Sequence, residues 1–382
     1  MLSQLRLRLV STASRSAQRG LATLGVQYAQ YGVPRAVLQV KTVEALGKPV
    51  GKQIKVKMLA SPINPSDLNM IEGTYGIKAS FPCFGGNEGV GVIEQLGEGV
   101  DASAALSVGD WVIPNEAGLG VWRQELIDDA SKFIKVANDI PVAYAATIGV
   151  NPCTAYRLLH DFAALKEGDV IIQNGANSMV GLAVIQMARE RGIRTINVVR
   201  SDRPETMKVN KLLTSLGGDV NITDDYLHSF AFQEILADLP PIKLAFNCVG
   251  GEAGTDLARC LASGGTMVTY GGMSKRPLKI PMDLLTSKQL QLRGFWMANW
   301  NTCHSMEEKR VMLDYIADLI RKQKLTFFFE LHDFDDFHHA LRVNSEPFNF
   351  RKVVLNLDYP DRFAEHDKLT PEDYWHFEAP VV

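Results

Sequence analysis

Residues 170–186 read VIIQNGANSMVGLAVIQ, and this stretch decides the fold class. A β-branched run ends at Gln173, and a polar segment then leads directly into an apolar segment with helical spacing. This order is typical of a strand, a phosphate-binding turn and a helix in a parallel sheet. Because the turn keeps only Gly181 of the G-x-G-x-x-G pattern, the motif by itself is weak, and an ordinary strand-to-helix turn is the alternative.

The surrounding sequence repeats the same alternation. Short β-branched runs alternate with helical segments between residues 169 and 296, which predicts an α/β fold with a Rossmann-type doubly wound parallel sheet. The expected strands cover residues 170–173, 195–200, 219–222, 244–249, 266–270 and 291–295, and the expected helices cover residues 180–191, 205–216, 226–236 and 255–261.

A second, β-rich domain is expected on both sides of this region. Residues 37–136 contain short strand-like runs separated by Gly and Pro. A helix is expected over 306–322, and strand-like segments at 326–331 and 352–357 are expected to return to the first domain. The predicted division is therefore a β-rich domain over 25–152 and 302–382, and a dinucleotide-binding domain over 153–301.

Composition excludes several classes of protein. The chain has 46% hydrophobic and 22% charged residues and a formal net charge of -3, which fits neither a disordered chain nor a protein that coats nucleic acid. No apolar run approaches the ~18 residues that span a bilayer. The 5 cysteines are scattered, which indicates neither a disulfide framework nor a Cys-x-x-Cys metal site. We expect no nucleic-acid partner and no membrane span.

The N-terminus predicts a mitochondrial address. The first acidic residue is Glu44, and the preceding arginines alternate with leucines and hydroxyl residues, as in mitochondrial presequences. Arg8 interrupts any apolar core that a secretory signal would need. We expect residues 1–24 to be a transit peptide to the matrix, removed between Arg19 and Leu24. A solvated, disordered tail is the alternative.

The end of the second expected strand bears on the choice of coenzyme. An NAD site would hold an acidic residue there, to bind the ribose 2′-hydroxyl. This chain has Arg200 there, with Arg203 close behind, and a guanidinium pairs well with a 2′-phosphate. NADP is therefore favoured over NAD. Asp202 lies between the two arginines and can instead pair with either of them, and solvated surface charge is the alternative for all three.

Two glycine pairs end strands on what should be the same edge of the sheet. They are Gly250-Gly251 and Gly271-Gly272. Ligands of doubly wound sheets lie outside the carboxyl ends of the strands, where a glycine pair lets the backbone approach a flat ring. One such pair can be a plain turn, but two in register with the phosphate turn favour a cofactor cleft.

The order of domains resembles that of the medium-chain dehydrogenase/reductase superfamily over residues 26–357. Zinc alcohol dehydrogenases of that superfamily carry Gly-His-Glu where this chain has Gly86-Asn87-Glu88, and their four-cysteine lobe is absent here. Without His and Cys ligands at a workable spacing, we predict no metal at this position. Proton transfer must then come from a side chain.

Six further motifs occur in order: NPSDLN at 64–69, GTYG at 73–76, GGNEG at 85–89, NPCTAY at 151–156, YGGM at 270–273 and RGFW at 293–296. Taken together, they resemble the mitochondrial enoyl-[acyl-carrier-protein] reductases, also called 2-enoyl thioester reductases. The resemblance implies a GroES-like fold for the β-rich catalytic domain and a homodimer. It also implies NADPH-dependent reduction of trans-2-enoyl thioesters, on acyl carrier protein or coenzyme A, in mitochondrial fatty-acid synthesis.

The resemblance also places the site. It assigns catalysis to Tyr75, and it assigns cofactor contacts to Asn151, Asn177, Ser178, Met179, Val180, Arg200, Asp202, Arg203, Tyr270, Gly271, Gly272, Met273, Phe295, Trp296, Met297 and Lys352. Family members often have glycine at the position of Met179. Compared with the family, Ser201 resembles a one-residue insertion in an Arg-Asp-Arg run. It leaves open whether Asp202 or Arg203 faces the 2′-phosphate. The tail over 358–382 runs past the usual end of the family.

A tyrosine suits this chemistry. When hydride adds to the β-carbon, negative charge develops on the thioester oxygen, where a neutral donor is needed. A phenol with a pKa of about 10 stays protonated and can also deliver a proton. For Tyr75 the alternative is a half-buried strand tyrosine with a satisfied hydroxyl.

For the whole chain the alternatives are another zinc-free NADPH reductase, such as a quinone oxidoreductase, and a non-catalytic binding protein on a reductase scaffold.

Overall fold

The computed structural model describes residues 22–101, 105–346 and 351–358, and the described residues divide into two compact units. Unit 1 holds residues 22–149, 329–345 and 353–358 of the described ranges, and unit 2 holds 150–328 with 346, 351 and 352. Most of the expected transit peptide, residues 1–21, and the tail after residue 358 lie outside the described residues.

Unit 2 contains a six-stranded sheet in the order β11-β10-β9-β12-β13-β14, and all of its pairings are parallel. The strands are β9 (Val170–Asn174), β10 (Arg194–Val199), β11 (Val220–Thr223), β12 (Leu244–Asn247), β13 (Thr266–Thr269) and β14 (Gln291–Gly294). The strand order reverses between β9 and β12, which is the topological switch point of a dinucleotide-binding sheet. The predicted doubly wound parallel sheet is confirmed.

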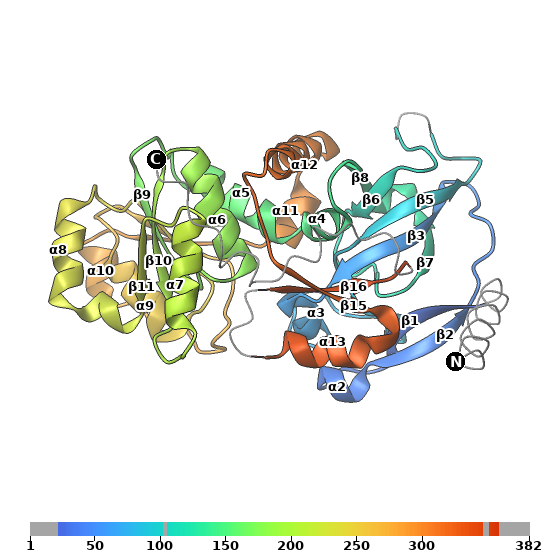
Figure 1. Cartoon of the computed structure of the whole chain (residues 1–382), viewed down its shortest axis with the longest axis horizontal. Coiled ribbons are helices and arrows are strands. Elements are labelled where there is room, and N and C mark those ends of the chain that lie inside the picture. Colours follow the sequence, from blue (N-terminus) through green and yellow to red (C-terminus); the bar gives the residue numbers. More distant parts are fainter. Residues whose placement is uncertain (1–21, 102–104, 347–350, 359–382) are drawn as a thin grey trace, which may run out of the picture. The chain divides into compact units, whose positions relative to one another are not determined.

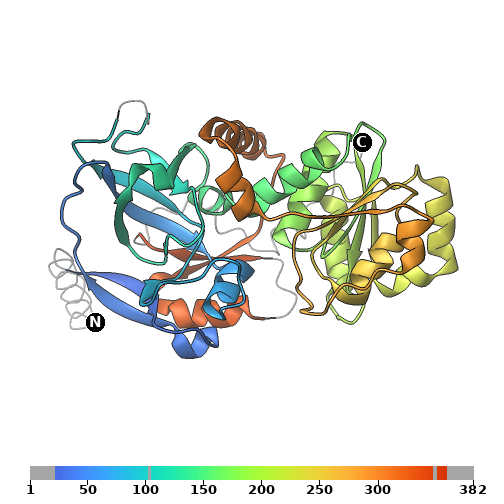
Figure 2. The same cartoon turned by 180° about the vertical axis from the view of Figure 1, so that it is seen from behind.

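Helices cover both faces of this sheet. Figure 1 shows α6 and α7 on one face, and Figure 2 shows α9 and α10 on the other. The helices of unit 2 are α5 (Asn151–Asp161), α6 (Met179–Glu190), α7 (Thr206–Ser215), the 3-10 helix η3 (Asp225–His228), α8 (Phe230–Asp238), α9 (Gly251–Arg259), α10 (Met282–Thr286), α11 (Met297–Cys303) and α12 (Met306–Arg321). Strands buried on both faces explain the near-continuous apolar runs in the sequence.

Two helix boundaries differ from the sequence-based prediction. The helix expected over 226–236 is split into η3 and α8, because the Ser229 side chain accepts a hydrogen bond from Phe232 N and caps a new helix. Helix α9 begins at Gly251 instead of residue 255, directly after Gly250, which has φ 77°. The predicted Gly250-Gly251 pair therefore serves as a helix start.

Unit 1 is built on two sheets and confirms the predicted β-rich, GroES-like fold. One sheet has the order β2-β1-β4, and the other has the order β15-β16-β3-β5-β6-β8 with β7 paired to β3. Its strands are β1 (Ala22–Tyr28), β2 (Gln39–Glu44), β3 (Gln53–Pro62), β4 (Cys83–Phe84), β5 (Val90–Leu96), β6 (Trp111–Pro114), β7 (Glu125–Asp129), β8 (Phe133–Val136), β15 (Phe329–Asp333) and β16 (Lys352–Asn356). Its helices are α2 (Pro34–Val37), α3 (Pro65–Ile71), η2 (Ala130–Lys132), α4 (Val142–Thr147), η4 (Phe334–Asp336) and α13 (Phe337–Asn344).

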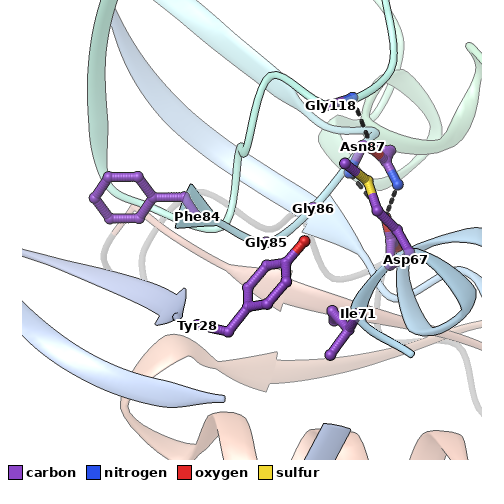
Figure 3. Close-up of a pocket in the computed structure, with 9 residues that line it drawn as sticks. Tyr28, Asp67, Ile71, Phe84, Gly85, Gly86, Asn87 and Gly118 are labelled. Atoms are coloured by element: carbon purple, nitrogen blue, oxygen red, sulfur yellow. Dashed lines mark hydrogen bonds between the residues drawn. The ribbon is translucent and has the colours of Figure 1, made fainter. Parts of the chain in front are cut away.

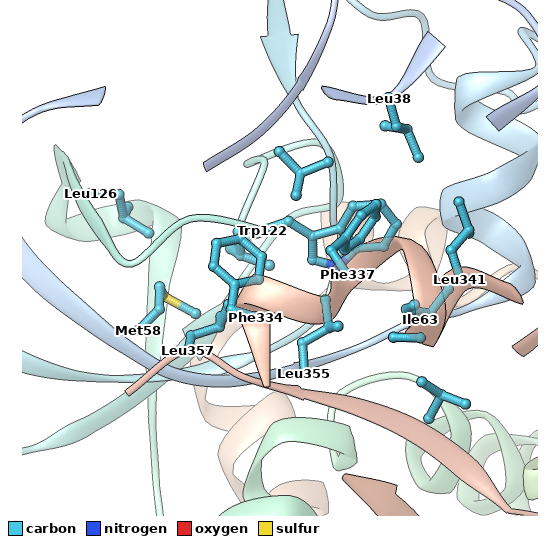
Figure 4. Close-up of a cluster of buried hydrophobic side chains, with 14 of the residues drawn as sticks. Leu38, Met58, Ile63, Trp122, Leu126, Phe334, Phe337, Leu341, Leu355 and Leu357 are labelled. Atoms are coloured by element: carbon cyan, nitrogen blue, oxygen red, sulfur yellow. The ribbon is translucent and has the colours of Figure 1, made fainter. Parts of the chain in front are cut away.

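The core of unit 1 joins segments from both ends of the chain. Figure 4 shows Phe334, Phe337 and Leu341 packed with Trp122 and Ile63. Trp122 and Phe337 are completely buried, and their ring centroids lie 5.2 Å apart. The C-terminal return is thus part of the first unit's hydrophobic core.

The return begins later than the predicted boundary at residue 302. Helix α12, which starts with a Ser305–Glu308 capping box, groups with unit 2, where Tyr315 packs on Tyr156 of α5 with ring centroids 5.2 Å apart. The chain joins unit 1 again at Phe329. Across the described residues, we find no helix that is both long and apolar enough for a membrane crossing.

Candidate functional site

The turn after β9 presents unpaired backbone amides. The Ser178 hydroxyl caps α6 by accepting a hydrogen bond from Gly181 N at 3.1 Å. The amides of Asn177, Met179 and Val180 have no hydrogen-bond partner within the described part of the chain. Because the N-terminus of α6 also carries the positive end of the helix dipole, this turn is suited to bind an anion such as a phosphate.

Gly181 is required by the packing of this turn. A Cβ at Gly181 would lie 2.4 Å from the carbonyl oxygen of Ala176, which no side chain tolerates without a backbone shift. The Gln173 side chain also donates to Gly181 O at 3.0 Å and ties the first turn of α6 to the strand. This explains why Gly181 is the glycine of the pattern that this chain keeps.

A buried amide chain crosses the switch point, and the sequence analysis missed it. Asn174 Nδ2 donates to Asn247 Oδ1 at 2.8 Å, and Asn247 Nδ2 donates to Thr269 Oγ1 at 3.1 Å. Asn174 Oδ1 accepts from Cys248 N at 2.8 Å. These bonds join the ends of β9, β12 and β13. The available signal was an Asn at the end of two apolar strand runs, where a buried amide needs partners.

The end of β13 combines an unsatisfied hydroxyl with open backbone. The Tyr270 oxygen is shielded from solvent and has no hydrogen-bond partner among the described residues. Burial, and then the neighbouring Cys248 thiol, raise the pKa of Tyr270 well above its ordinary value, so the phenol stays neutral. A Cβ at Gly272 would meet nothing within 4 Å, and the Met273 side chain is 63% exposed. This edge therefore has space and a spare polar group for a ligand.

The arginine segment follows β10 as predicted. Arg200 and Asp202 are exposed, and Arg203 Nε lies 3.4 Å from Asp202 Oδ1. The Thr206 hydroxyl donates to the carbonyl oxygens of Arg200 and Arg203, which anchors the loop to the start of α7. Because an ion pair this exposed is weak, the Arg203 guanidinium can exchange it for a phosphate.

The structure brings most of the predicted cofactor residues to one edge of the sheet. Phe295, Trp296 and Met297 follow β14, and the Phe295 ring packs edge-on against Phe162 with centroids 6.0 Å apart. Trp296 is 40% exposed, whereas Met297 is buried. Two predicted residues come from outside the sheet of unit 2: Asn151 is the first residue of α5, and Lys352, 9% exposed, begins β16.

Tyr75 lies in unit 1 on a short loop after α3. The backbone amides of Thr74 and Tyr75 both donate to Asn69 O, at 2.9 and 3.1 Å. Gly73 has φ 77°, a left-handed conformation that favours glycine, and lets the chain leave the helix sharply. The predicted loop between glycines is therefore present, and the Tyr75 side chain is partly exposed on it.

Asn87, at the position of the zinc-ligand histidine, belongs to a hydrogen-bond network in Figure 3. Asp67 Oδ1 accepts from Asn87 N and Asn87 Nδ2, both at 2.8 Å, and Asn87 Oδ1 accepts from Gly118 N at 2.7 Å. Asp67 Oδ2 accepts from Asn64 N at 2.7 Å and closes the first turn of α3. The amide thus links the loop at Gly118 to the helix that precedes Tyr75.

The walls of this region are close-packed. A Cβ at Gly85 or Gly86 would lie 2.5 Å from the Trp122 ring. The small pocket that Asn87 and Tyr28 help to line has room for about one water molecule. Burial, and then a contact with Cys83, raise the pKa of Tyr28, which therefore stays neutral. The network therefore holds α3, the helix before the Tyr75 loop, to the segments at Asn87 and Gly118.

Replacing Asp67 by Ala is expected to lower the free energy of unfolding by about 3 kcal/mol, because three buried donors lose their acceptor. Urea unfolding followed by circular dichroism measures this change. Glu94→Ala is the control, since Glu94 makes only a 3.8 Å ion pair with Lys55 and is expected to cost less than about 0.5 kcal/mol. Equal losses in the two variants would mean that the network is not stabilising.

Both units match known protein families. Residues 51–137 match the alcohol dehydrogenase GroES-like domain, and residues 180–314 match the zinc-binding dehydrogenase family. Together with the strand order of unit 2, these matches define a member of the medium-chain dehydrogenase/reductase superfamily.

Individual relatives are more specific. A human protein, "Enoyl-[acyl-carrier-protein] reductase, mitochondrial", is 46% identical over 331 residues, which are 86% of this chain and 87% of the relative. The chain belongs to the mitochondrial enoyl-[acyl-carrier-protein] reductase family. The Etr1p/Etr2p heterodimer, a mitochondrial 2-enoyl thioester reductase from Candida tropicalis, has a TM-score of 0.80 at 33% identity and covers 88% of this chain and 100% of its own. An Etr1p complex with NADP and crotonyl-CoA has a TM-score of 0.79 at 32% identity, with the same coverage.

Proposed function

We propose that this protein reduces trans-2-enoyl thioesters to saturated acyl thioesters with NADPH in mitochondrial fatty-acid synthesis. The observation that carries the proposal is membership of the enoyl-[acyl-carrier-protein] reductase family, whose solved relative binds NADP and crotonyl-CoA. The mitochondrial names of the relatives and the basic, acid-free N-terminus both support a mitochondrial location.

The residues of unit 2 fit NADPH. The free amides of Asn177, Met179 and Val180 would hold the pyrophosphate, and Arg200 with Arg203 would pair with the 2′-phosphate. The open backbone at Gly272 and the unsatisfied hydroxyl of Tyr270 suit the nicotinamide end. When bound, NADPH supplies the hydride that adds to the β-carbon of the enoyl group.

Tyr75 is proposed to act on the thioester itself. As the β-carbon gains two electrons with the hydride, the carbon–carbon double bond opens and charge moves onto the thioester oxygen. The Tyr75 hydroxyl would donate a hydrogen bond to that oxygen and supply a proton for the α-carbon, which completes the saturated product. The hydrogen bonds to Asn69 hold the backbone of this loop for that task.

Side-by-side assays test the proposed function. With NADPH, we expect crotonyl-CoA to be reduced at least ~10²-fold more efficiently, in kcat/KM, than a simple benzoquinone, because only the thioester needs a placed proton donor. NADH in place of NADPH should lower kcat/KM by ~10-fold or more, since the arginines lose their phosphate partner. Preferential reduction of the quinone would favour the quinone oxidoreductase alternative. No turnover of either acceptor would favour the non-catalytic one.

Two finer assignments are also proposals. The acyl group is proposed to arrive on acyl carrier protein as well as on coenzyme A, because the family is named for the carrier substrate.

A homodimer is proposed through β14, an edge strand whose residues are all exposed and which includes Leu292. Sedimentation equilibrium measures the mass of the assembly.

A further inference from the structure

The C-terminal return of unit 1 carries a group of polar side chains as well as its core residues. Phe334 and Phe337 point into the core in Figure 4 and are at most 4% exposed. Three other side chains of the same segment, His332, Asp336 and His339, have one ligand atom each within 4.8 Å of one another. They come from β15, from the end of η4 and from the first turn of α13, so a short segment gathers two imidazoles and a carboxylate.

One nitrogen of His332 is buried without a hydrogen-bond partner. The His332 side chain is 10% exposed, and its Nε2 atom makes no hydrogen bond to any described residue. Glu330 Oε1 lies 3.3 Å from this nitrogen, and the His339 ring centroid lies 5.3 Å from that of His332. A buried, unsatisfied imidazole nitrogen beside a carboxylate and a second imidazole is the arrangement of a ligand without its ion.

Asp336 supports the same assignment. It occupies the N-cap position of α13, where an aspartate ordinarily accepts a backbone hydrogen bond, but its side chain makes no such bond. No described residue forms an ion pair or hydrogen bond with this carboxylate. The carboxylate is therefore available to bind a cation.

We propose that His332, Asp336 and His339 bind a divalent metal ion of the zinc type. Imidazole nitrogen with one carboxylate oxygen is a donor set that Zn²⁺ and Co²⁺ accept, with Glu330 or water as a fourth ligand. Bonds of ~2.1 Å would place the donors ~3.4 Å apart, so donor atoms that lie within 4.8 Å must approach by at most ~1.4 Å. Asp336 is exposed and can rotate to do so. The ion would link β15 to α13 and is distinct from the superfamily's zinc position at Asn87.

Arg342 opposes the ion in this structure. Its guanidinium contacts His339 Nδ1 and occupies a lone pair that a metal could use. Binding must displace this guanidinium or use the other nitrogen, and in both cases the positive charge disfavours a cation nearby. The proposal therefore predicts that Arg342→Gln binds metal more tightly than the wild type does, whereas a merely structural histidine cluster predicts no such gain.

Metal titration of the purified full-length protein tests the proposal. After treatment with EDTA and its removal, we expect one Zn²⁺ to bind with a Kd of about 10 µM or tighter by calorimetry, and Co²⁺ to give a visible d–d absorption. His332→Gln and His339→Gln should each weaken binding by at least ~10-fold, and Arg342→Gln should strengthen it by ~3-fold or more. These variants are expected to fold, because Phe334 and Phe337 supply the packing of the segment.

His338→Gln is the matched control. His338 is exposed, is the neighbour of His339 on α13, and is absent from the three-residue group, so its replacement should leave the Kd within twofold. Circular dichroism of each metal-free variant separates loss of the site from loss of the fold. Binding no tighter than about 1 mM in the wild type, or equal weakening by His338→Gln and His339→Gln, would overturn the proposal.

Discussion

Tyr75→Phe should lower turnover of crotonyl-CoA by one to three orders of magnitude, with KM changed by less than about threefold. The substitution removes one oxygen and keeps the ring, so binding that does not depend on the hydroxyl is retained. The hydrogen bond to the developing thioester charge and the proton for the α-carbon are both lost. A placed acid of this kind typically contributes ~10²- to 10⁴-fold. Steady-state NADPH oxidation at saturating substrate measures the effect.

Tyr226→Phe is the matched control for this experiment. Tyr226 is a partly exposed tyrosine in η3 of unit 2, where it packs against Phe232 with ring centroids 6.4 Å apart. Loss of its hydroxyl should leave turnover unchanged. If the Tyr75→Phe enzyme kept turnover within twofold of the wild type, Tyr75 would have no part in the mechanism, and another donor would have to be sought.

Gly181→Val is expected to weaken NADPH binding by ~10- to 100-fold, which corresponds to the 1–3 kcal/mol typical of overpacking. The Cβ alone would lie 2.4 Å from Ala176 O, so the turn must move, and the amides of Asn177 to Val180 would leave their positions. The substitution leaves Tyr75 in place, so turnover by the variant should recover at high NADPH concentration. Fluorescence titration with NADPH measures the Kd directly.

The control for this variant is Gly47→Val. An added Cβ at Gly47 meets nothing within 4 Å, and its φ is not positive, so the same change in volume should alter neither stability nor the Kd. Gly181→Ala should fall between the wild type and Gly181→Val. An unchanged NADPH affinity in Gly181→Val would exclude this turn from the coenzyme site.

Local patterns predicted the sheet well because its strands are buried on both faces. The predicted strand over 170–173 ends one residue before β9 does, and the parallel order around it agrees with the predicted alternation of strands and helices. Helix ends were less predictable. The cap at Ser229 depends on one hydroxyl meeting one amide, and a periodic apolar pattern does not register that contact.

The candidate site likewise has a part that sequence motifs reveal and a part that only the structure reveals. The turn around Gly181, the arginines after β10 and the loop carrying Tyr75 are consecutive in sequence, so motifs reveal them. Single hydrogen bonds in the network of Asp67, Asn87 and Gly118 join positions up to 31 residues apart, and the bond from Asn174 to Asn247 joins positions 73 apart. In the sequence, Asn87, Asn174 and Asn247 are ordinary polar residues. Only their hydrogen-bond partners in the structure show what each side chain does.

By itself the amino-acid sequence determined the class of fold, the order of the two parts and the residues of each turn, because these depend on local periodicity and on neighbours along the chain. Tertiary structure alone decided where the chain returns to unit 1 and which polar side chains are satisfied. The physical reason is that hydrogen bonding and burial depend on distances in space, and those distances arise only when segments far apart in sequence pack together.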